Sequence, residues 1–360
     1  MRVLIYAING LGMGHLNRTL VLARAMQAAE PETAIHFVVD SPHFQRVSRS
    51  GFQVTKFPDR RHPLGFHKGR ARRYEDLPEL FDVLFQSFEP DALLVDFLCK
   101  RALFARAAAR GIHLAAVLRK LRPAAARNLA LNRGASFVDS WLLPHSAEEL
   151  PLSELPRSLR ARAQHLGPVV RGIDSERVAA QRERFTTAEG VPLVLATIGG
   201  GGAGESQQLF DGLEAALSES GRPVRLVMVY GPNYPGPLPT SGSSSGLEVE
   251  RLRSEPDLPE LMAAADLVVC NAGYNTIREV RASGTPALVV PLRTTGRDDQ
   301  EERARSLADA GRALSSSSDV TEMSRNIAAI LDQAVVEKLV PTAAADPAAL
   351  GRRVLSALEG

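Results

Sequence analysis

A histidine inside a glycine-rich turn is the side chain of this sequence best suited to proton transfer. His15 closes the stretch 9–15, which follows the apolar run 3–7 and contains Gly12 and Gly14. Imidazole exchanges protons near neutral pH, and glycines allow the backbone to approach a ligand closely. We therefore expect a ligand at this turn and His15 as a general base. An ordinary tight turn with an incidental histidine is the alternative.

The same turn fits the dinucleotide-binding pattern Gly-x-Gly-x-x-Gly only in part. Counted from Gly10, the position of the third glycine is held by His15. Asp40, at the end of the next apolar run, does match the ribose-binding acid of that pattern. A dehydrogenase therefore stays an alternative that the glycine spacing disfavours.

A run of four glycines follows a second apolar run. It comprises Gly199, Gly200, Gly201 and Gly202, and Thr197 lies two residues before it. Successive glycines expose several backbone N–H groups in a concave loop, which suits a pyrophosphate. Since no Lys-Ser/Thr pair follows, the loop is not that of the nucleotide triphosphatases. A flexible turn without function is the alternative.

A third segment encodes a strand, a turn and a helix in close succession. Asn271 and Gly273 lie in the turn, and Asn275 and Thr276 fall in the first helical turn, where side chains and free backbone N–H groups could bind a phosphate. Glu279, one turn further along the same face, could accept hydrogen bonds from ribose hydroxyls. The alternative is an ordinary helix cap followed by a solvated carboxylate.

The composition is that of a globular protein with balanced charge. Of 360 residues, 43 are Lys or Arg and 41 are Asp or Glu, which gives a net charge of +2 and no overall field that would favour nucleic acid as a partner. The opening apolar run is too short for a signal peptide, and no apolar run approaches the roughly 20 residues that span a bilayer. We therefore expect a cytoplasmic protein whose cysteines, Cys99 and Cys270, are core residues.

Short apolar runs alternate with longer segments of helical spacing, which predicts parallel sheets flanked by helices. The strands are expected at 3–7, 34–39, 92–95, 112–117, 193–198, 225–230, 267–270 and 287–290. Helices are expected at 15–28, 100–110 and 348–358. A surface loop rich in Gly, Pro and Ser is expected at 232–246.

The chain is longer than one hydrophobic core usually grows, so two domains are expected. The alternation of strand and helix loosens near 166–171 and starts again after a charged helical stretch at 174–189. We predict an α/β protein with two Rossmann-like domains whose parallel sheets face each other across a cleft. The domains are 1–167 and 168–345, and a C-terminal helix within 346–360 packs on either of them.

Both glycine loops and the segment 271–279, in this order and spacing, resemble glycosyltransferase family 28, the group that includes the peptidoglycan N-acetylglucosaminyltransferase. Residues 283–311 continue the resemblance, and residues 165–171 are similar to the interdomain junction of such enzymes. The resemblance implies an inverting, metal-independent glycosyltransferase of the GT-B fold, without a cofactor. Its donor would be a UDP- or dTDP-sugar.

The resemblance also implies which substrate each of the two domains binds. The N-terminal domain would bind a hydroxyl-bearing acceptor, and the C-terminal domain would bind the donor nucleotide with Glu279 on its ribose. In related plant and natural-product transferases an aspartate orients the catalytic histidine. Asp96, which follows the strand at 92–95, is similarly placed with respect to His15.

Gly12, Gly14, Asp299 and Gln300 are expected beside the transferred sugar or the acceptor. Here the sequence departs from the peptidoglycan enzymes, which carry two glutamines in place of Asp299-Gln300 and a different segment around Asp96. The identity of the sugar and the identity of the acceptor therefore cannot be inferred from the peptidoglycan enzymes. The nucleotide base and the oligomeric state also stay open.

Residues 60–73 concentrate positive charge in an otherwise balanced chain. A solvated, mobile loop is one interpretation. Contact with an anionic acceptor, or with the inner face of a membrane by a peripherally bound protein, is the other.

Two further functions are consistent with the same residues. A nucleotide-sugar hydrolase of the same fold would use water in place of the acceptor, and a small family of such enzymes carries a loop similar to residues 12–15. A non-catalytic nucleotide-sugar-binding protein would need neither His15 nor Asp96, so the presence of both argues against it.

Overall fold

The computed structural model divides the chain into two compact units. It describes residues 1–8, 13–57, 63–67, 70–73, 79–96, 100–186, 188–200, 206–234, 236–244, 246–292, 300–309, 313–317, 319–332 and 345–359. Unit 1 comprises Met1–Gly10, His15–Val169 and Ala345–Gly360, and unit 2 comprises Leu11–Gly14 and Val170–Ala344. The division after Val169 lies two residues beyond the predicted boundary at 167.

Unit 1 is built around a sheet of parallel strands in the order β3-β2-β1-β6-β7-β8-β9. Its strands are β1 (Arg2–Ala7), β2 (Ala34–Val39), β3 (Gln53–Lys56), β6 (Ala92–Asp96), β7 (His113–Val117), β8 (Ser140–Leu143) and β9 (Ala163–His165). Its helices are α1 (Gly14–Ala29), α2 (Gln45–Ser48), α3 (Glu79–Phe88), α4 (Arg101–Ala108), α5 (Pro123–Ala130), α6 (Arg157–Arg160) and α13 (Pro347–Glu359), with short 3-10 helices at Ala135–Phe137 and Leu152–Glu154. The central strands are apolar on both faces because helices cover both.

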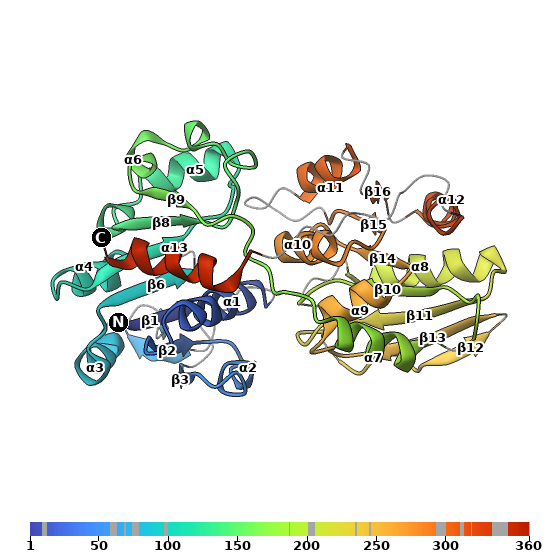
Figure 1. The fold of residues 1–360 in the computed structure, drawn as a ribbon, viewed down its shortest axis with the longest axis horizontal. Coiled ribbons are helices and arrows are strands. Elements are labelled where there is room, and N and C mark those ends of the chain that lie inside the picture. The colour runs from blue at the N-terminus through green and yellow to red at the C-terminus, as the bar shows by residue number, and fades with distance from the viewer. Residues whose placement is uncertain are drawn as a thin grey trace. The chain divides into compact units, whose positions relative to one another are not determined.

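The C-terminal helix α13 packs within unit 1, where it lies beside α1 and contacts β7 and β8 (Figure 1). Leu350, Val354 and Leu358 are buried on its inner face. A Cβ on Gly351 would lie 1.9 Å from the carbonyl oxygen of Ala25 on α1, so only glycine allows this approach. Of the two positions expected for this helix, the structure shows the one on the N-terminal unit.

Residues 63–73 contain a pair of strands where the sequence predicted a loop. β4 (Pro63–His67) and β5 (Arg70–Arg73) pair in antiparallel fashion, with a shift of register between Pro63 and Gly65. The expectation of an unstructured basic loop was therefore wrong for these residues. Phe66 and the arginines of β5 share a hairpin that charge content alone does not reveal. Residues 60–62, 68 and 69 lie outside the described residues.

Unit 2 contains a second, mostly parallel sheet in the order β12-β13-β11-β10-β14-β15-β16. Its strands are β10 (Leu193–Thr197), β11 (Val224–Val229), β12 (Gly242–Ser244), β13 (Leu247–Leu252), β14 (Leu267–Cys270), β15 (Ala287–Val289) and β16 (Ala313–Ser315). Its helices are α7 (Ser175–Phe185), α8 (Ser206–Ser220), α9 (Leu258–Ala264), α10 (Tyr274–Ser283), α11 (Gln300–Asp309) and α12 (Val320–Leu331). Two apolar clusters, one on each face of the sheet, form its core.

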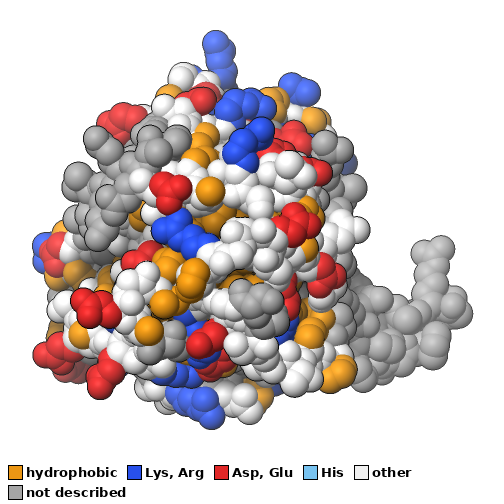
Figure 2. Space-filling view, turned by 90° about the vertical axis from the view of Figure 1, so that its right-hand side faces the viewer, with side chains coloured by type: hydrophobic (Ala, Val, Ile, Leu, Met, Phe, Trp, Pro, Cys, Tyr) orange, Lys and Arg blue, Asp and Glu red, His pale blue; other side chains and the backbone are white. Residues whose placement is uncertain are grey.

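The predicted α/β class with parallel sheets is confirmed in both units, and each of the predicted strands is present to within one residue at either end. The predicted surface loop 232–246 was partly wrong, because β12 adds an antiparallel edge strand to β13. The face drawn in Figure 2 shows Lys and Arg interspersed with Asp and Glu, as the balanced charge suggests. In the described part of the chain, no helix combines the length and the apolar character needed to cross a membrane.

Candidate functional site

His15 and Asp96 come together because their strands are neighbours. β1 and β6 pair in parallel, with Tyr6 opposite Val95, so both strands end at the same edge of the sheet. Asp96 is the last residue of β6, and His15 is the second residue of α1, which follows β1. The structure thus unites two predicted residues that are 81 positions apart in sequence, since 96 − 15 = 81.

The imidazole and the carboxyl form a close pair. His15 Nδ1 lies 3.2 Å from Asp96 Oδ1, and the side chain of Asp96 is fully buried whereas that of His15 is 21% exposed. A partly exposed imidazole whose Nδ1 lies against a buried carboxylate is the arrangement that lets histidine take up a proton from a ligand through its other ring nitrogen. The geometry therefore fits a general base, with Asp96 as its positioning partner.

A third side chain, Arg18, completes this group and was missed in the sequence. Its Nη2 donates a hydrogen bond of 2.8 Å to Asp96 Oδ1 and lies 2.7 Å from Oδ2 and 3.4 Å from His15 Nδ1. The Arg18 side chain is 2% exposed. The signal was its spacing: three residues after His15, Arg18 shares a helix face with it, and a buried arginine requires a partner.

The ionisation of Asp96 follows from these neighbours. Burial by itself would raise the pKa of the Asp96 carboxyl, but the positive charge of Arg18, the charge of His15 and hydrogen bonds from both outweigh it. The pKa of Asp96 therefore lies well below its usual range, and the residue is a carboxylate at neutral pH.

The glycine run 199–202 and the segment 271–279 follow neighbouring parallel strands of unit 2. β10 and β14 pair in parallel, with Thr197 opposite Cys270, so the loops that follow them are adjacent. Gly199 adopts a φ of +66°, which favours glycine, and its missing Cβ would lie 3.6 Å from Thr276 Oγ1. Gly200 follows in the same turn, whereas Gly201 and Gly202 lie outside the described residues.

Asn271 ties these two loops together. Its side-chain Nδ2 donates to the carbonyl oxygen of Ile198 at 3.3 Å, and its Oδ1 accepts from the backbone N–H of Gly273, also at 3.3 Å. The side chain of Thr197 is buried, and its Oγ1 accepts from the N–H of Gly199 at 3.4 Å. Asn271 and Thr197, predicted as nucleotide contacts, thus hold the shape of the loops in this structure.

The N-terminus of α10 opens onto the same loops. Gly273 is its N-cap and supplies no side chain, so the first N–H groups of the helix are not capped by that residue. A Cβ on Gly273 would lie 3.3 Å from Thr276 Oγ1, which places this hydroxyl beside the helix start. Neither Asn275 nor Thr276 is the helix cap, and the motif leaves a helix end of the kind that binds phosphate.

Glu279 lies one turn further along α10 and is half-buried. Burial raises the pKa of the Cys270 thiol to about 12, and the negative charge of Glu279 contributes to the rise. The Glu279 carboxylate is therefore close enough to the end of β14 to affect this thiol. Cys270 is a buried free thiol and stays protonated, as expected of a core residue. Cys99 lies outside the described residues.

The remaining predicted residues have varied surroundings. Gly14 begins α1, and Gly12 lies outside the described residues. Gln300 is buried, and its Oε1 accepts from the backbone N–H of Leu292 at 3.1 Å, which fixes the segment after β15; Asp299 is not described. Arg303 donates through Nε to the carbonyl oxygen of Ala272 at 2.8 Å and so anchors the third motif, a role that the sequence did not reveal.

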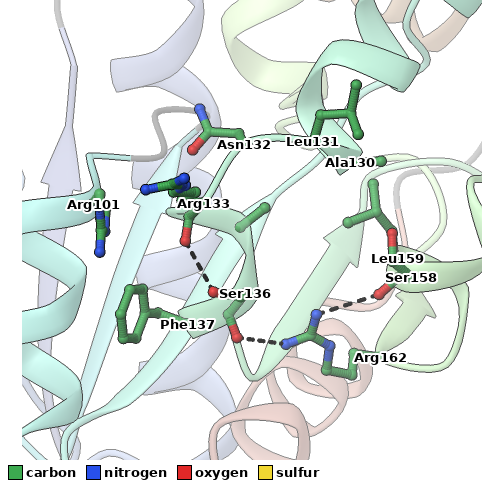
Figure 3. A pocket seen from close by; sticks show the side chains of 11 residues that line it. Arg101, Ala130, Leu131, Asn132, Arg133, Ser136, Phe137, Ser158, Leu159 and Arg162 are labelled. Carbon is green, nitrogen blue, oxygen red and sulfur yellow. Dashed lines mark hydrogen bonds between the residues drawn. The ribbon is translucent and has the colours of Figure 1, made fainter.

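A cavity of about 400 Å³ lies elsewhere in unit 1 and is lined by none of the predicted site residues (Figure 3). Arg101, Arg133 and Arg162 line it. Arg162 donates to the carbonyl oxygens of Ser136 at 3.2 Å and Ser158 at 3.3 Å, so its position serves the local fold. Because no lining side chain can act as a base near neutral pH, we place the site at the strand ends, not at this cavity. The described residues contain no group of three or more potential metal ligands.

One protein family matches the C-terminal half of the chain. The family described as Glycosyltransferase family 28 C-terminal domain matches residues 193–354. This span contains every residue predicted to bind the donor nucleotide, from Thr197 to Glu279.

The relatives share only parts of their length with this chain. A UDP-N-acetylglucosamine–N-acetylmuramyl-(pentapeptide) pyrophosphoryl-undecaprenol N-acetylglucosamine transferase from Solibacter usitatus is 38% identical over 94 residues, 26% of either chain. A transferase of the same name from Leuconostoc mesenteroides is 24% identical over 319 residues, 84% of this chain and 82% of the relative. The chain spans 26 to 41% of the length of the first three curated relatives that it matches.

Among solved structures, a UDP-glucosyltransferase from Polygonum tinctorium superposes with a TM-score of 0.67 over 100% of this chain and 98% of its own, at 13% identity. At that identity the likeness concerns the fold. The fold is the GT-B fold of two Rossmann-like domains.

Proposed function

Because residues 193–354 match the family described as Glycosyltransferase family 28 C-terminal domain, we propose that the whole chain is a glycosyltransferase. It moves a sugar from a nucleotide-sugar donor to a hydroxyl group of an acceptor. The observation that carries the proposal is the pair of loops after β10 and β14, held together by Asn271 at the N-terminus of α10.

The donor nucleotide binds in unit 2. The turn at Gly199 and the start of α10 present backbone N–H groups and the positive end of a helix dipole, which favour a diphosphate. Glu279 accepts hydrogen bonds from the ribose hydroxyls. Since backbone groups and the helix end neutralise the departing diphosphate, the reaction needs no metal ion.

Unit 1 binds the acceptor and carries the base. As the acceptor oxygen attacks the anomeric carbon, its proton passes to Nε2 of His15. The bond between the anomeric carbon and the phosphate oxygen breaks, and the nucleoside diphosphate leaves with the electron pair. One displacement of this kind inverts the anomeric centre. Asp96 holds the imidazole and stabilises the cation that forms.

The name of the Leuconostoc relative makes UDP-N-acetylglucosamine the first donor to test. The acceptor is a separate question, since residues 1–192 lie outside the matched family domain. A hydrolase would use the same base on water, because the His15 side chain is 21% exposed and water could reach it as well as a hydroxyl group could. The two activities differ in whether donor turnover needs an acceptor.

The test is an assay of nucleoside diphosphate release by the full chain. UDP-N-acetylglucosamine, other UDP-sugars and dTDP-sugars are incubated with and without a panel of acceptors that carry hydroxyl groups. Release that requires an acceptor, and a product of inverted configuration, supports the transferase. Release that is equally fast without acceptor supports the hydrolase instead.

Calorimetry with UDP and dTDP separates binding from chemistry. The wild type and His15→Ala should bind the same nucleotide with equal affinity, because the donor loops belong to unit 2 and His15 to unit 1. If neither nucleotide binds the wild-type chain, the proposed function is wrong.

A further inference from the structure

The buried carboxylate of Asp96 faces two groups that can carry positive charge. Its side chain is 0% exposed, and both Arg18 and His15 project to it from the first two turns of α1. Among the described residues, these two side chains of α1 supply the charges that act on the pKa of Asp96. A single buried negative charge thus has two potential partners, and the chemistry depends on which of them neutralises it.

A carboxylate in this position requires a positive charge. Removing an ion from water is unfavourable unless it is paired and hydrogen-bonded. Arg18 meets that need at every physiological pH, because a guanidinium does not lose its proton in proteins. It also makes the shorter contacts, 2.8 and 2.7 Å to the two oxygens against 3.2 Å for His15 Nδ1.

We propose that Arg18 is a positioning residue that supplies the positive charge required by Asp96, so that His15 remains a neutral imidazole able to accept a proton. The inference rests on the proposed function, in which His15 is the base. With Arg18 in place, the carboxylate orients the imidazole without drawing a proton onto it before the acceptor binds.

The contacts also assign the tautomer of that imidazole. Asp96 Oδ1 accepts from Arg18, and His15 Nδ1 lies 3.2 Å from the same oxygen, which could accept from Nδ1 if the proton is there. In the other tautomer Nδ1 would accept from Arg18 Nη2 at 3.4 Å, a long contact to a donor already bonded to the carboxylate at 2.8 Å. The tautomer with the proton on Nδ1 leaves the lone pair on Nε2, where a base needs it.

Removal of Arg18 should convert His15 from a base into a cation. In Arg18→Met the buried carboxylate keeps one partner that can become positive, so the imidazole should gain its proton at higher pH. In Asp96→Asn the opposite holds, because the guanidinium then faces the imidazole without a carboxylate between them. The two substitutions should therefore move the titration of His15 in opposite directions.

The experiment is an NMR titration of the imidazole groups in the full-length wild type, Arg18→Met, Arg18→Lys and Asp96→Asn. A His15→Gln sample identifies the signals of His15. We expect the midpoint to rise by about one pH unit or more in Arg18→Met, a tenfold change in protonation at fixed pH. Arg18→Lys keeps the charge and should restore the wild-type midpoint to within a few tenths.

Several outcomes would overturn the inference. One is a folded Arg18→Met with the wild-type midpoint, and another is ¹⁵N shifts that place the wild-type proton on Nε2. If Arg18→Met does not fold, Asp96→Asn is the remaining test, since an unchanged or raised midpoint there contradicts the role of Arg18. A purely structural Arg18 would leave the midpoint of a folded Arg18→Met unchanged.

This titration uses no substrate, so its failure is distinct from a failure of the proposed function. A fully active His15→Ala would remove the base and the proposed mechanism, whatever the titration shows. An inactive His15→Ala together with unmoved midpoints would keep the base and reject the role of Arg18.

Discussion

Substitution of Gly351 by alanine tests how closely α13 packs on α1. The added Cβ would meet the carbonyl oxygen of Ala25 at 1.9 Å, its carbonyl carbon at 2.5 Å and the Cβ of Ala29 at 2.9 Å. Two of these three atoms are backbone, so no side chain can rotate away. To restore an ordinary contact of about 3.4 Å, the helices would have to separate by roughly 1.5 Å.

Two opposing effects set the sign of the change in stability. Alanine favours a helix interior over glycine by about 1 kcal/mol. Separation of the helices loosens Leu350, Val354 and Leu358, which are all buried, and insertion of a methyl group into a packed core costs typically about 1 to 3 kcal/mol. Because the clash is with backbone, we expect the upper part of that range and a net loss of about 2 kcal/mol.

The single tryptophan of the chain reports on this unit alone. Trp141 on β8 is fully buried in unit 1, so its fluorescence during urea unfolding follows the unit that contains α13. Ser356→Ala is the matched control, since Ser356 is exposed on the same helix and gains propensity without a clash. If Gly351→Ala stabilises unit 1 as the control does, the close approach of α13 to α1 is wrong.

Four further outcomes follow from the site. His15→Ala and Asp96→Asn should each lower kcat by roughly 10² to 10⁴, and the double mutant should be little worse than His15→Ala. Additive losses in steady-state assays would show that the two residues act separately. Glu279→Gln should weaken nucleotide binding by about 1 to 3 kcal/mol in calorimetry, with Glu183→Gln on the exposed face of α7 as the control, and an unchanged affinity would make Glu279 a solvated carboxylate. Reversal of the arginines at 70–73 should raise the acceptor KM at low salt and leave donor affinity alone, and an unmoved KM would make the hairpin ordinary surface. The pKa of Asp96 is lower in the folded than in the unfolded state, so its stabilising contribution is present above about pH 4 and is lost as the pH falls toward the folded-state pKa. In Asp96→Asn, the free energy of unfolding should therefore fall less steeply between about pH 4 and pH 2.

The sequence predicted the strands that are mostly buried, among them the short β15, and missed the more exposed strands β3, β9, β13 and β16 and the short apolar β8. β6, β10 and β14 are buried throughout, and β1 is buried from its second residue on, so each contains a continuous apolar run. β9, with the sequence Ala-Gln-His, has no apolar pattern of its own and exists because β8 lies beside it. Pairing with a neighbour in space, which periodicity cannot report, decides such edge strands.

From the sequence, only those site residues could be predicted that lie next to the ends of strands. The spacing of glycines located the loops after β10 and β14, but the roles of their side chains were not visible, since Asn271 bonds backbone groups 73 and 2 positions away. The pairing of His15 with Asp96 came from a family resemblance. Arg18 was missed because its partner is 78 positions away, so only the three-dimensional structure shows that its charge is buried.

The path of the chain has a consequence for its synthesis. Unit 1 contains residues 1–10 and 15–169 and also the helix at 347–359, whereas the segment 170–344 belongs to unit 2. Domains generally fold in the order in which the ribosome releases them. Here the unit that begins first receives its last helix only after unit 2 has been translated. A nascent chain paused before residue 347 would therefore expose the surfaces of α1, β7 and β8 that α13 later covers.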